Sequence, residues 1–176
     1  MTFSLQPFPS TESRTDLQIT GNIVRNGNQL HLDYALRGNL KEIFIAAPSD
    51  TPTRKHELWQ ETCFEFFLGV KNSERYWEFN LSPARHWNVY RFDGYRQGMQ
   101  EETAFITLPF SVEYEADYLA IALDVNLDKI VSVDQALDVA ITTVIKHKDG
   151  EVTYWALTHR GTEADFHLRD SFMIKL

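Results

Sequence analysis

Residues 58–97 contain three successive segments in which polar residues alternate with apolar ones. Side chains along a β-strand point to opposite faces in turn, so each segment read as a strand has one apolar side and one mixed side. If the segments are neighbouring strands, one sheet face carries Glu65, Glu78, Asn80, Asn88 and Tyr90. Carboxylate and amide groups gathered in this way can accept and donate hydrogen bonds to a hydroxyl-rich ligand. The surface is therefore either a solvated sheet face or the floor of a binding site.

Tryptophan residues close to these segments can supply a stacking surface. Trp77 and Trp87 fall on the apolar sides of their strands and are predicted to be core residues. Trp59 stands just before the first strand, and Trp155 lies on a late strand. Sugars are bound by an aromatic ring under their C–H face together with hydrogen bonds to their hydroxyls. Glutamate is disfavoured inside strands, so the mid-strand positions of Glu65 and Glu78 favour a site over a plain wet face.

The elements that must position these residues are short strands and tight turns. Asn26-Gly27 and Asp149-Gly150 are signals for type I′ hairpin turns. About ten strands recur every 8–12 residues, with KEIFIA (41–46) among them, and there is no convincing amphipathic helix. We predict an all-β fold, an antiparallel β-sandwich of two packed sheets, formed by residues 1–176 as one domain with an irregular N-terminal arm over 1–14.

Composition restricts the partners and the compartment. The net charge of −8 argues against nucleic acid, which requires a basic surface. The sequence shows no apolar run of membrane-spanning length and no signal peptide, so we expect no membrane partner and a cytoplasmic location. The single cysteine, Cys63, excludes an intramolecular disulfide and is expected to be a buried, inert thiol.

Several stretches resemble the DOMON-like superfamily, and within it the modules similar to family 9 carbohydrate-binding modules. The matching stretches are LWQETCFEFFL (58–68), YWEFNLSP (76–83), YWA (154–156), DFH (165–167) and SF (171–172). The resemblance implies a two-sheet β-sandwich whose sugar-binding members hold a sugar between two tryptophans, with a Glu, an Arg and amide groups on its hydroxyls. For this chain it implies Trp59 and Trp155 as the rings, Glu65 as a hydroxyl acceptor, and Arg85 or Arg91 as the basic donor.

We therefore expect a non-catalytic protein that binds a sugar or oligosaccharide, with Trp59, Glu65, Glu78, Asn80, Arg85 and Trp155 in the site. One alternative is a haem b electron-transfer module, since other DOMON-like proteins bind haem through Met, His or Lys. Met99 and six histidines are available for this, although covalent c-type attachment lacks its Cys-x-x-Cys-His motif. Another alternative is a protein-interaction domain with no small ligand.

Catalytic and metal chemistry have weaker support in the sequence. Glu65 and Glu78 are the residue types of a glycosidase acid/base pair, but nothing else in the sequence indicates turnover. His159, Asp165 and His167 match no zinc spacing. We expect no cofactor, and a structural calcium ion would have to bind without an EF-hand motif.

Overall fold

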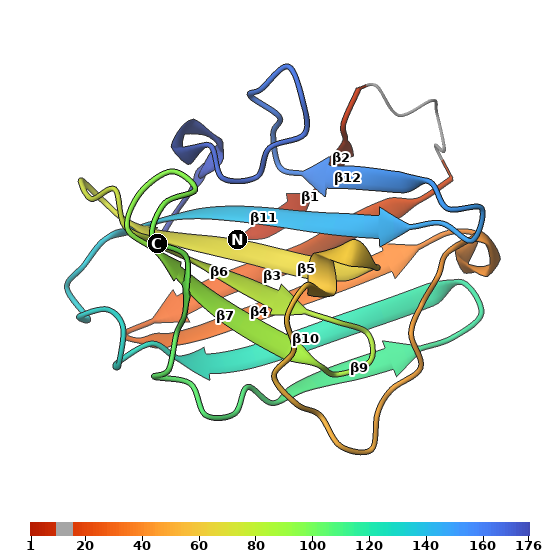
Figure 1. Cartoon of the computed structure of the whole chain (residues 1–176), viewed down its shortest axis with the longest axis horizontal. Coiled ribbons are helices and arrows are strands. Elements are labelled where there is room, and N and C mark those ends of the chain that lie inside the picture. Colours follow the sequence, from red (N-terminus) through yellow and green to blue (C-terminus); the bar gives the residue numbers. More distant parts are fainter. Residues whose placement is uncertain (10–15) are drawn as a thin grey trace.

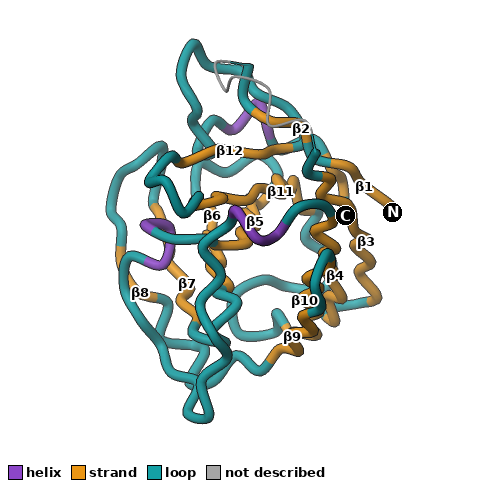
Figure 2. Tube along the Cα trace, turned by 90° about the vertical axis from the view of Figure 1, so that its right-hand side faces the viewer, coloured by secondary structure: helices purple, strands orange, loops and turns teal. Residues whose placement is uncertain are grey.

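The computed structural model describes residues 1–9 and 16–176, which form two antiparallel sheets packed face to face (Figures 1 and 2). The smaller sheet contains β1 (Thr2–Ser4), β3 (Gln18–Asn26), β4 (Gln29–Arg37), β10 (Tyr118–Asn126) and β9 (Phe110–Tyr114), in that order. The larger sheet contains, in order, β2 (Gln6–Pro7), β12 (Val152–Ala156), β11 (Leu137–Lys146), β5 (Cys63–Val70), β6 (Tyr76–Leu81), β7 (Trp87–Phe92) and β8 (Gln100–Glu101). Its eighth strand, β13 (Ile174–Lys175), pairs with β11. The predicted antiparallel β-sandwich is confirmed, with thirteen strands in the described residues rather than about ten.

Helical structure in the described residues is limited to three short 3-10 turns, η1 (Leu40–Glu42), η2 (Leu58–Gln60) and η3 (Arg169–Ser171). None of the described residues belongs to a helix with the length and apolar character needed to cross a membrane.

Hairpins form at both predicted positions, but neither turn is type I′, because that type needs a positive φ at both central residues and each of these turns has a positive φ at its glycine alone. Asn26 pairs with Gln29 at the end of β3 and β4, and Gly27 between them has φ +61°. Gly150 has φ +98° in the turn that joins β11 to β12. Glycine adopts this left-handed backbone without the steric cost that a side chain brings.

The core lies between the sheets and follows the predicted alternation. Phe66 of β5 and Phe79 of β6 are register partners, and their rings stack with centroids 4.4 Å apart. Tyr34 of the opposite sheet donates a hydrogen bond to the Glu65 carbonyl oxygen at 2.6 Å, which ties the layers together. Trp77 and Trp87 are buried in the same cluster, as predicted.

Two expected elements differ from the structure. The arm predicted over residues 1–14 is not irregular at its start: β1 pairs with β3 and β2 pairs with β12, while residues 10–14 lie outside the described residues. The strand predicted over 41–46 is replaced by η1 and one isolated bridge at Ile43. Leu40 and Ile43 are both buried, and their spacing of three places them on one side of a 3-10 turn.

Pairing of β1 with β3 depends on Gly21, the register partner of Phe3. A Cβ at Gly21 would overlap the Asp33 carbonyl oxygen and the Phe3 ring. We expect Gly21→Ala to lower the free energy of unfolding by about 1–3 kcal/mol, the usual cost of overpacking. Urea denaturation measures this, with Val24→Ala as the control because Val24 lies on the same strand and is 46% exposed. Equal unfolding free energies for the two variants would contradict the close approach of β1 to β3.

Candidate functional site

The outer face of the larger sheet is buried rather than solvated. All six residues of β6 and seven of the eight in β5 are buried, so both faces of these strands are covered. A second hydrophobic cluster lies on this outer face, separate from the core between the sheets. Its members are Phe67, Tyr76, Tyr90, Phe92, Ala140 and Phe172, with Trp59 and Phe166 packed against them.

A cavity of about 410 Å³ opens beside this cluster. Its polar lining consists of Glu65, Glu78, Arg96 and His167. Its aromatic lining consists of Trp59, Phe67, Phe92, Tyr154 and Phe166. The volume falls in the range of small-molecule sites, which are mostly apolar with a few converging polar groups.

Trp59 reaches the cavity from η2, immediately before β5. Its ring meets the Tyr90 ring edge-on, with centroids 5.7 Å apart and the planes at 64°. Tyr90 is itself held by hydrogen bonds at its hydroxyl, from Asn88 Nδ2 at 2.9 Å and with His56 Nδ1 at 3.1 Å. The stacking ring therefore rests on a side chain whose own position is fixed.

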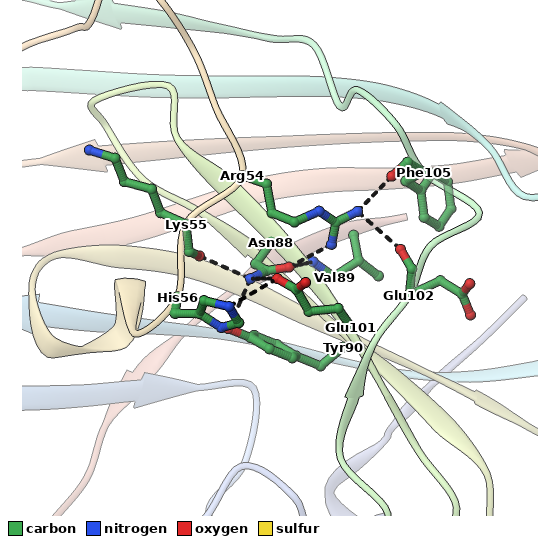
Figure 3. A network of polar contacts seen from close by, with 9 residues as sticks. All are labelled: Arg54, Lys55, His56, Asn88, Val89, Tyr90, Glu101, Glu102 and Phe105. Atoms are coloured by element: carbon green, nitrogen blue, oxygen red, sulfur yellow. Dashed lines mark hydrogen bonds and ion pairs between the residues drawn. The ribbon is translucent and has the colours of Figure 1, made fainter.

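Asn88 joins the segment before Trp59 to the sheet in the polar network of Figure 3. Its Oδ1 accepts a hydrogen bond from Arg54 Nη1 at 2.7 Å, and its Nδ2 lies 3.0 Å from the Lys55 carbonyl oxygen. Arg54 Nη2 also donates to the carbonyl oxygens of Glu102 and Phe105, at 3.0 and 2.6 Å. Asn88 is thus a buried anchor for the neighbouring segments.

The carboxyl groups of Glu65 and Glu78 lie on the cavity floor. Glu65 pairs with Asn80 across β5 and β6, and Glu78 is two residues away from Asn80 on the same face. Asn80 Nδ2 donates to Glu78 Oε1 at 2.8 Å, and Thr142 Oγ1 donates to Glu65 Oε2 at 3.4 Å. Glu65 Oε1 is buried and has no hydrogen-bond partner among the described residues. A buried polar atom without a partner is costly, so this floor is incomplete without a ligand or water.

Burial sets the protonation of this pair. Desolvation raises the pKa of Glu65 well above its usual value, and the nearby Glu78 charge raises it further. Desolvation also raises the pKa of Glu78 to about 7, although the Asn80 hydrogen bond and the Arg96 charge oppose the shift. Two carboxyl groups in one dry site do not both ionise readily, so the floor retains at least one proton at neutral pH.

Part of the cavity wall is formed by two loops linked through Asp165. Arg96 Nη2 lies 2.9 Å from Asp165 Oδ1, and Tyr95 Oη donates to Asp165 Oδ2 at 2.6 Å. His167 Nδ1 is 2.8 Å from the Tyr76 hydroxyl, and burial lowers the pKa of His167 to about 4. The wall therefore presents a neutral imidazole and an arginine whose charge is balanced by Asp165.

The structure brings three of the six predicted site residues to the cavity, namely Trp59, Glu65 and Glu78. Asn80 is fully buried beside Glu78 and supports the floor without lining the cavity. Arg85 lies in the turn after β6 with φ +67°, beside a different hollow that Arg54 and Trp87 also line.

Trp155 does not face Trp59. It is 3% exposed in the core between the sheets, and its indole nitrogen donates to Thr153 Oγ1 at 3.0 Å. Because neighbours on a strand point to opposite faces, β12 presents Tyr154 to the cavity instead. Tyr154 is thus the ring that β12 contributes to the cavity, and its edge-to-face partner is Phe166, with centroids 6.0 Å apart.

Several lining residues were missed in the sequence. Arg96 occupies the place of the basic donor that was expected at Arg85 or Arg91, and Arg91 instead contacts Gln100 at 3.1 Å. His167 and Phe166 belong to the DFH stretch that carried part of the resemblance, which was the available signal for them. The sequence carries no comparable signal for Arg96. This residue lies in a loop, where strand alternation does not apply, and its uncommon φ of +53° is not evident from its residue type.

The residues of the cavity do not fit haem b. Met99 and His167 both line it, and both are haem ligand types. However, His167 Nε2 already faces Glu78 Oε2 at 3.8 Å. The floor is acidic, and the arginine of the lining, Arg96, is paired with Asp165, so the carboxylates of a haem would meet like charge.

The described part of the chain also has no group of three or more His, Cys, Asp or Glu residues arranged to hold a metal ion. His159 is engaged elsewhere, with its Nε2 2.9 Å from the Gln6 carbonyl oxygen. Cys63 is fully buried, and burial raises the pKa of its thiol, which does not suit a nucleophile.

Comparison with solved structures identifies the class of fold. The chain is similar to a candidate carbohydrate-binding protein from Bacteroides uniformis ATCC 8492, with a TM-score of 0.64 and 13% sequence identity over 97% of this chain and 84% of the other. The predicted β-sandwich, with its likeness to carbohydrate-binding proteins, is confirmed at the level of the fold. The DOMON-like part of the resemblance stays a prediction.

Two further matches are weaker. A family 9 carbohydrate-binding module from Caldicellulosiruptor kristjanssonii in complex with glucose gives a TM-score of 0.49 at 12% identity, over 82% of this chain and 69% of that one. The same organism's family 9 module with cellotriose gives 0.46 at 12% identity, over 81% and 67%. No protein-family model and no curated protein sequence matches this chain.

The raised pKa of Glu78 predicts a specific pH dependence of stability. Between its unfolded value of 4.5 and its folded value of about 7, the folded chain holds a proton that the unfolded chain releases. Stability is therefore lost as the pH rises through this window, by about 1.4 kcal/mol for each tenfold difference in proton affinity. We expect Glu78→Gln to remove most of this loss. The free energy of unfolding of the variant should therefore rise relative to that of the wild type between pH 5 and pH 8.

Urea unfolding across that range measures the difference, with Glu113→Gln as the control because Glu113 is an exposed glutamate on β9. A constant offset between Glu78→Gln and wild type at every pH would mean that Glu78 titrates alike in the folded and unfolded chains.

Proposed function

We propose that this chain binds a carbohydrate in the cavity on the outer face of the larger sheet and does not turn it over. The observation that carries the proposal is the position of Trp59, which is half-buried and lines a cavity beside Glu65, whose buried Oε1 has no hydrogen-bond partner in the part of the chain that the structure describes. An aromatic ring beside polar groups that lack partners is the arrangement that a sugar satisfies, because a sugar has both a C–H face and hydroxyls.

The lining residues supply complementary parts of such a site. Trp59 offers its ring to the apolar face of a sugar, and Tyr154 offers a second ring from β12. The floor groups Glu65 and Glu78 accept hydrogen bonds from hydroxyls, and a protonated carboxyl also donates one. Arg96 adds a donor at the wall. The fold similarity to a candidate carbohydrate-binding protein supports the same class of function.

Binding is better supported than hydrolysis. A general acid must come within hydrogen-bond reach of the bond that it protonates. Glu65 Oε2 accepts a hydrogen bond from Thr142 Oγ1 and Glu78 Oε1 accepts one from Asn80 Nδ2, so each carboxyl group is held in place by a neighbouring side chain. The carboxyl groups thus suit a fixed recognition surface.

Replacing Trp59 tests the proposal directly. We expect Trp59→Ala to weaken binding of a sugar found on a glycan array by at least about tenfold, or about 1.4 kcal/mol, because the stacking surface is lost. Isothermal titration calorimetry measures the change. Tyr114→Ala is the control, since Tyr114 is a 54% exposed aromatic residue on β9 that does not line the cavity.

The proposal is contradicted if neither the glycan array nor calorimetry detects a sugar that binds. It is also contradicted if Trp59→Ala and wild type bind the sugar with equal affinity.

The neighbouring rings of β12 give an internal comparison. Tyr154 lines the cavity and Trp155 is in the core, so Tyr154→Ala is expected to weaken sugar binding by several fold. Trp155→Phe is expected to lower stability, because a large core side chain is reduced, and to leave the sugar affinity of the folded protein unchanged. Calorimetry with urea denaturation separates the two effects. If Trp155→Phe loses sugar affinity and Tyr154→Ala does not, the second stacking ring is Trp155 and the assignment to Tyr154 is wrong.

A further inference from the structure

We propose that the sugar taken by this cavity carries a protonated amine, so that the ligand is an amino sugar rather than a neutral or acidic one. The inference rests on the proposed function and adds the chemical class of the ligand. It is carried by two buried carboxyl groups that share one cavity with aromatic walls and an arginine that is already paired.

The charges that face the cavity do not balance. Glu65 on β5 and Glu78 on β6 contribute two carboxyl groups to the floor. The cation that faces them is Arg96, and Asp165 lies 2.9 Å from its guanidinium. Among the described residues that line the cavity there is no lysine.

The other titratable groups packed around the floor are neutral. Burial raises the pKa of the Cys63 thiol and raises those of the Tyr76 and Tyr90 hydroxyls to about 12. Burial lowers the pKa of His167 to about 4, so its imidazole is uncharged near pH 7. Ionised carboxylates on the floor face Arg96 as their cation, which Asp165 already pairs, and burial raises the pKa of both carboxyl groups.

A ligand ammonium group supplies what the floor lacks. It has three hydrogen-bond donors and a positive charge, and charge-assisted hydrogen bonds are stronger than neutral ones. Among the described residues Glu65 Oε1 has no hydrogen-bond partner, and Glu78 Oε2 lies 3.8 Å from His167 Nε2. An ammonium group above this pair would allow both carboxyl groups to ionise.

The aromatic walls favour the same charge. Trp59, Phe67, Phe92, Tyr154 and Phe166 line the cavity. Ring faces attract cations within about 6 Å of their centroids. A sugar carboxylate or phosphate would instead meet the acidic floor.

The test compares each amino sugar with its neutral parent by calorimetry on the full chain at pH 6.5. The probes are glucosamine, galactosamine and mannosamine against glucose, galactose and mannose. We expect at least one amino sugar to bind tenfold or more tightly than its parent, and its N-acetyl derivative, which has no charge, to lose that preference. The inference is overturned if no amino sugar binds more tightly than its parent.

Variants and proton counting separate recognition from a structural effect. We expect Glu78→Gln and Glu65→Gln each to reduce the ratio of amino-sugar to parent affinity several fold, while Glu113→Gln keeps the wild-type ratio. Titration in two buffers of different ionisation enthalpy should show proton release with the amino sugar and not with its parent, because the floor ionises. An unchanged ratio in both floor variants, or equal proton exchange with both ligands, overturns the inference.

Failure of this inference is distinguishable from failure of the proposed function. If neutral sugars bind as tightly as their amino derivatives, the inferred preference for an amine is wrong, but the proposed carbohydrate binding still holds. Cyclohexylamine has a ring and an ammonium group without hydroxyls. If it binds as tightly as the best amino sugar, the hydroxyls contribute nothing and the proposed function fails as well.

Discussion

Burial of β5 and β6 on both faces is the constraint on which the rest of this structure depends. The inner face joins the core between the sheets, as β-sandwiches require. The outer face carries Glu65, Glu78 and Asn80, which would be ordinary polar residues if they were wet. Covering that face removes their water, so each polar group must find a partner in the protein or a ligand. The cavity and its raised carboxyl pKa values are both consequences of this covering.

The segments that cover the outer face are fastened by polar anchors at several places. Arg169 lies over Gly69 of β5 where a Cβ would collide with its guanidinium, and its Nη2 donates to the Val70 carbonyl oxygen at 3.2 Å. The same guanidinium lies 4.6 Å above the centroid of the Phe172 ring. Arg169 thus fixes the loop that brings His167 to the cavity, much as Asn88 fixes the segment before Trp59. Both anchors therefore hold segments that line the cavity, which contains Trp59 and His167 in its wall.

The part of the site that the sequence predicted is the part governed by local periodicity. Glu65, Glu78 and Asn80 share one face because alternation within a strand and pairing of consecutive strands leave little freedom. The prediction that Trp155 lines the site was wrong for the complementary reason. Alternation along the strand requires the rings of Tyr154 and Trp155 to point to opposite faces of the sheet. It does not determine which of the two rings faces the core. That choice depends on the pairing of β12 with β11, whose position beside β5 a local pattern does not reveal.

The cavity residues that lie in loops could not be predicted from strand alternation. Arg96 reaches the cavity through a left-handed backbone position and an ion pair with Asp165, 69 residues away along the chain. Arg85 has a positive φ as well, yet its turn leads to another hollow. Period-two patterns do not apply to loops, and the residue type alone does not distinguish the two arginines. The fold was more predictable than the site because hairpin turns and strand alternation are short-range signals.

The polar floor of the cavity also has a cost in stability. Two neighbouring strands that each carry a glutamate towards a dry space depart from the local rules that stabilise a sheet, and Glu65 Oε1 has no hydrogen-bond partner among the described residues. Such departures are expected where a protein binds something, because a ligand that pairs with those groups recovers the lost interactions. A ligand that binds only the folded chain also shifts the folding equilibrium towards it. The proposed recognition and the stability of the fold are therefore coupled through the same two carboxyl groups, and complete apolar packing of this face would strengthen the sheet but remove the polar floor of the cavity.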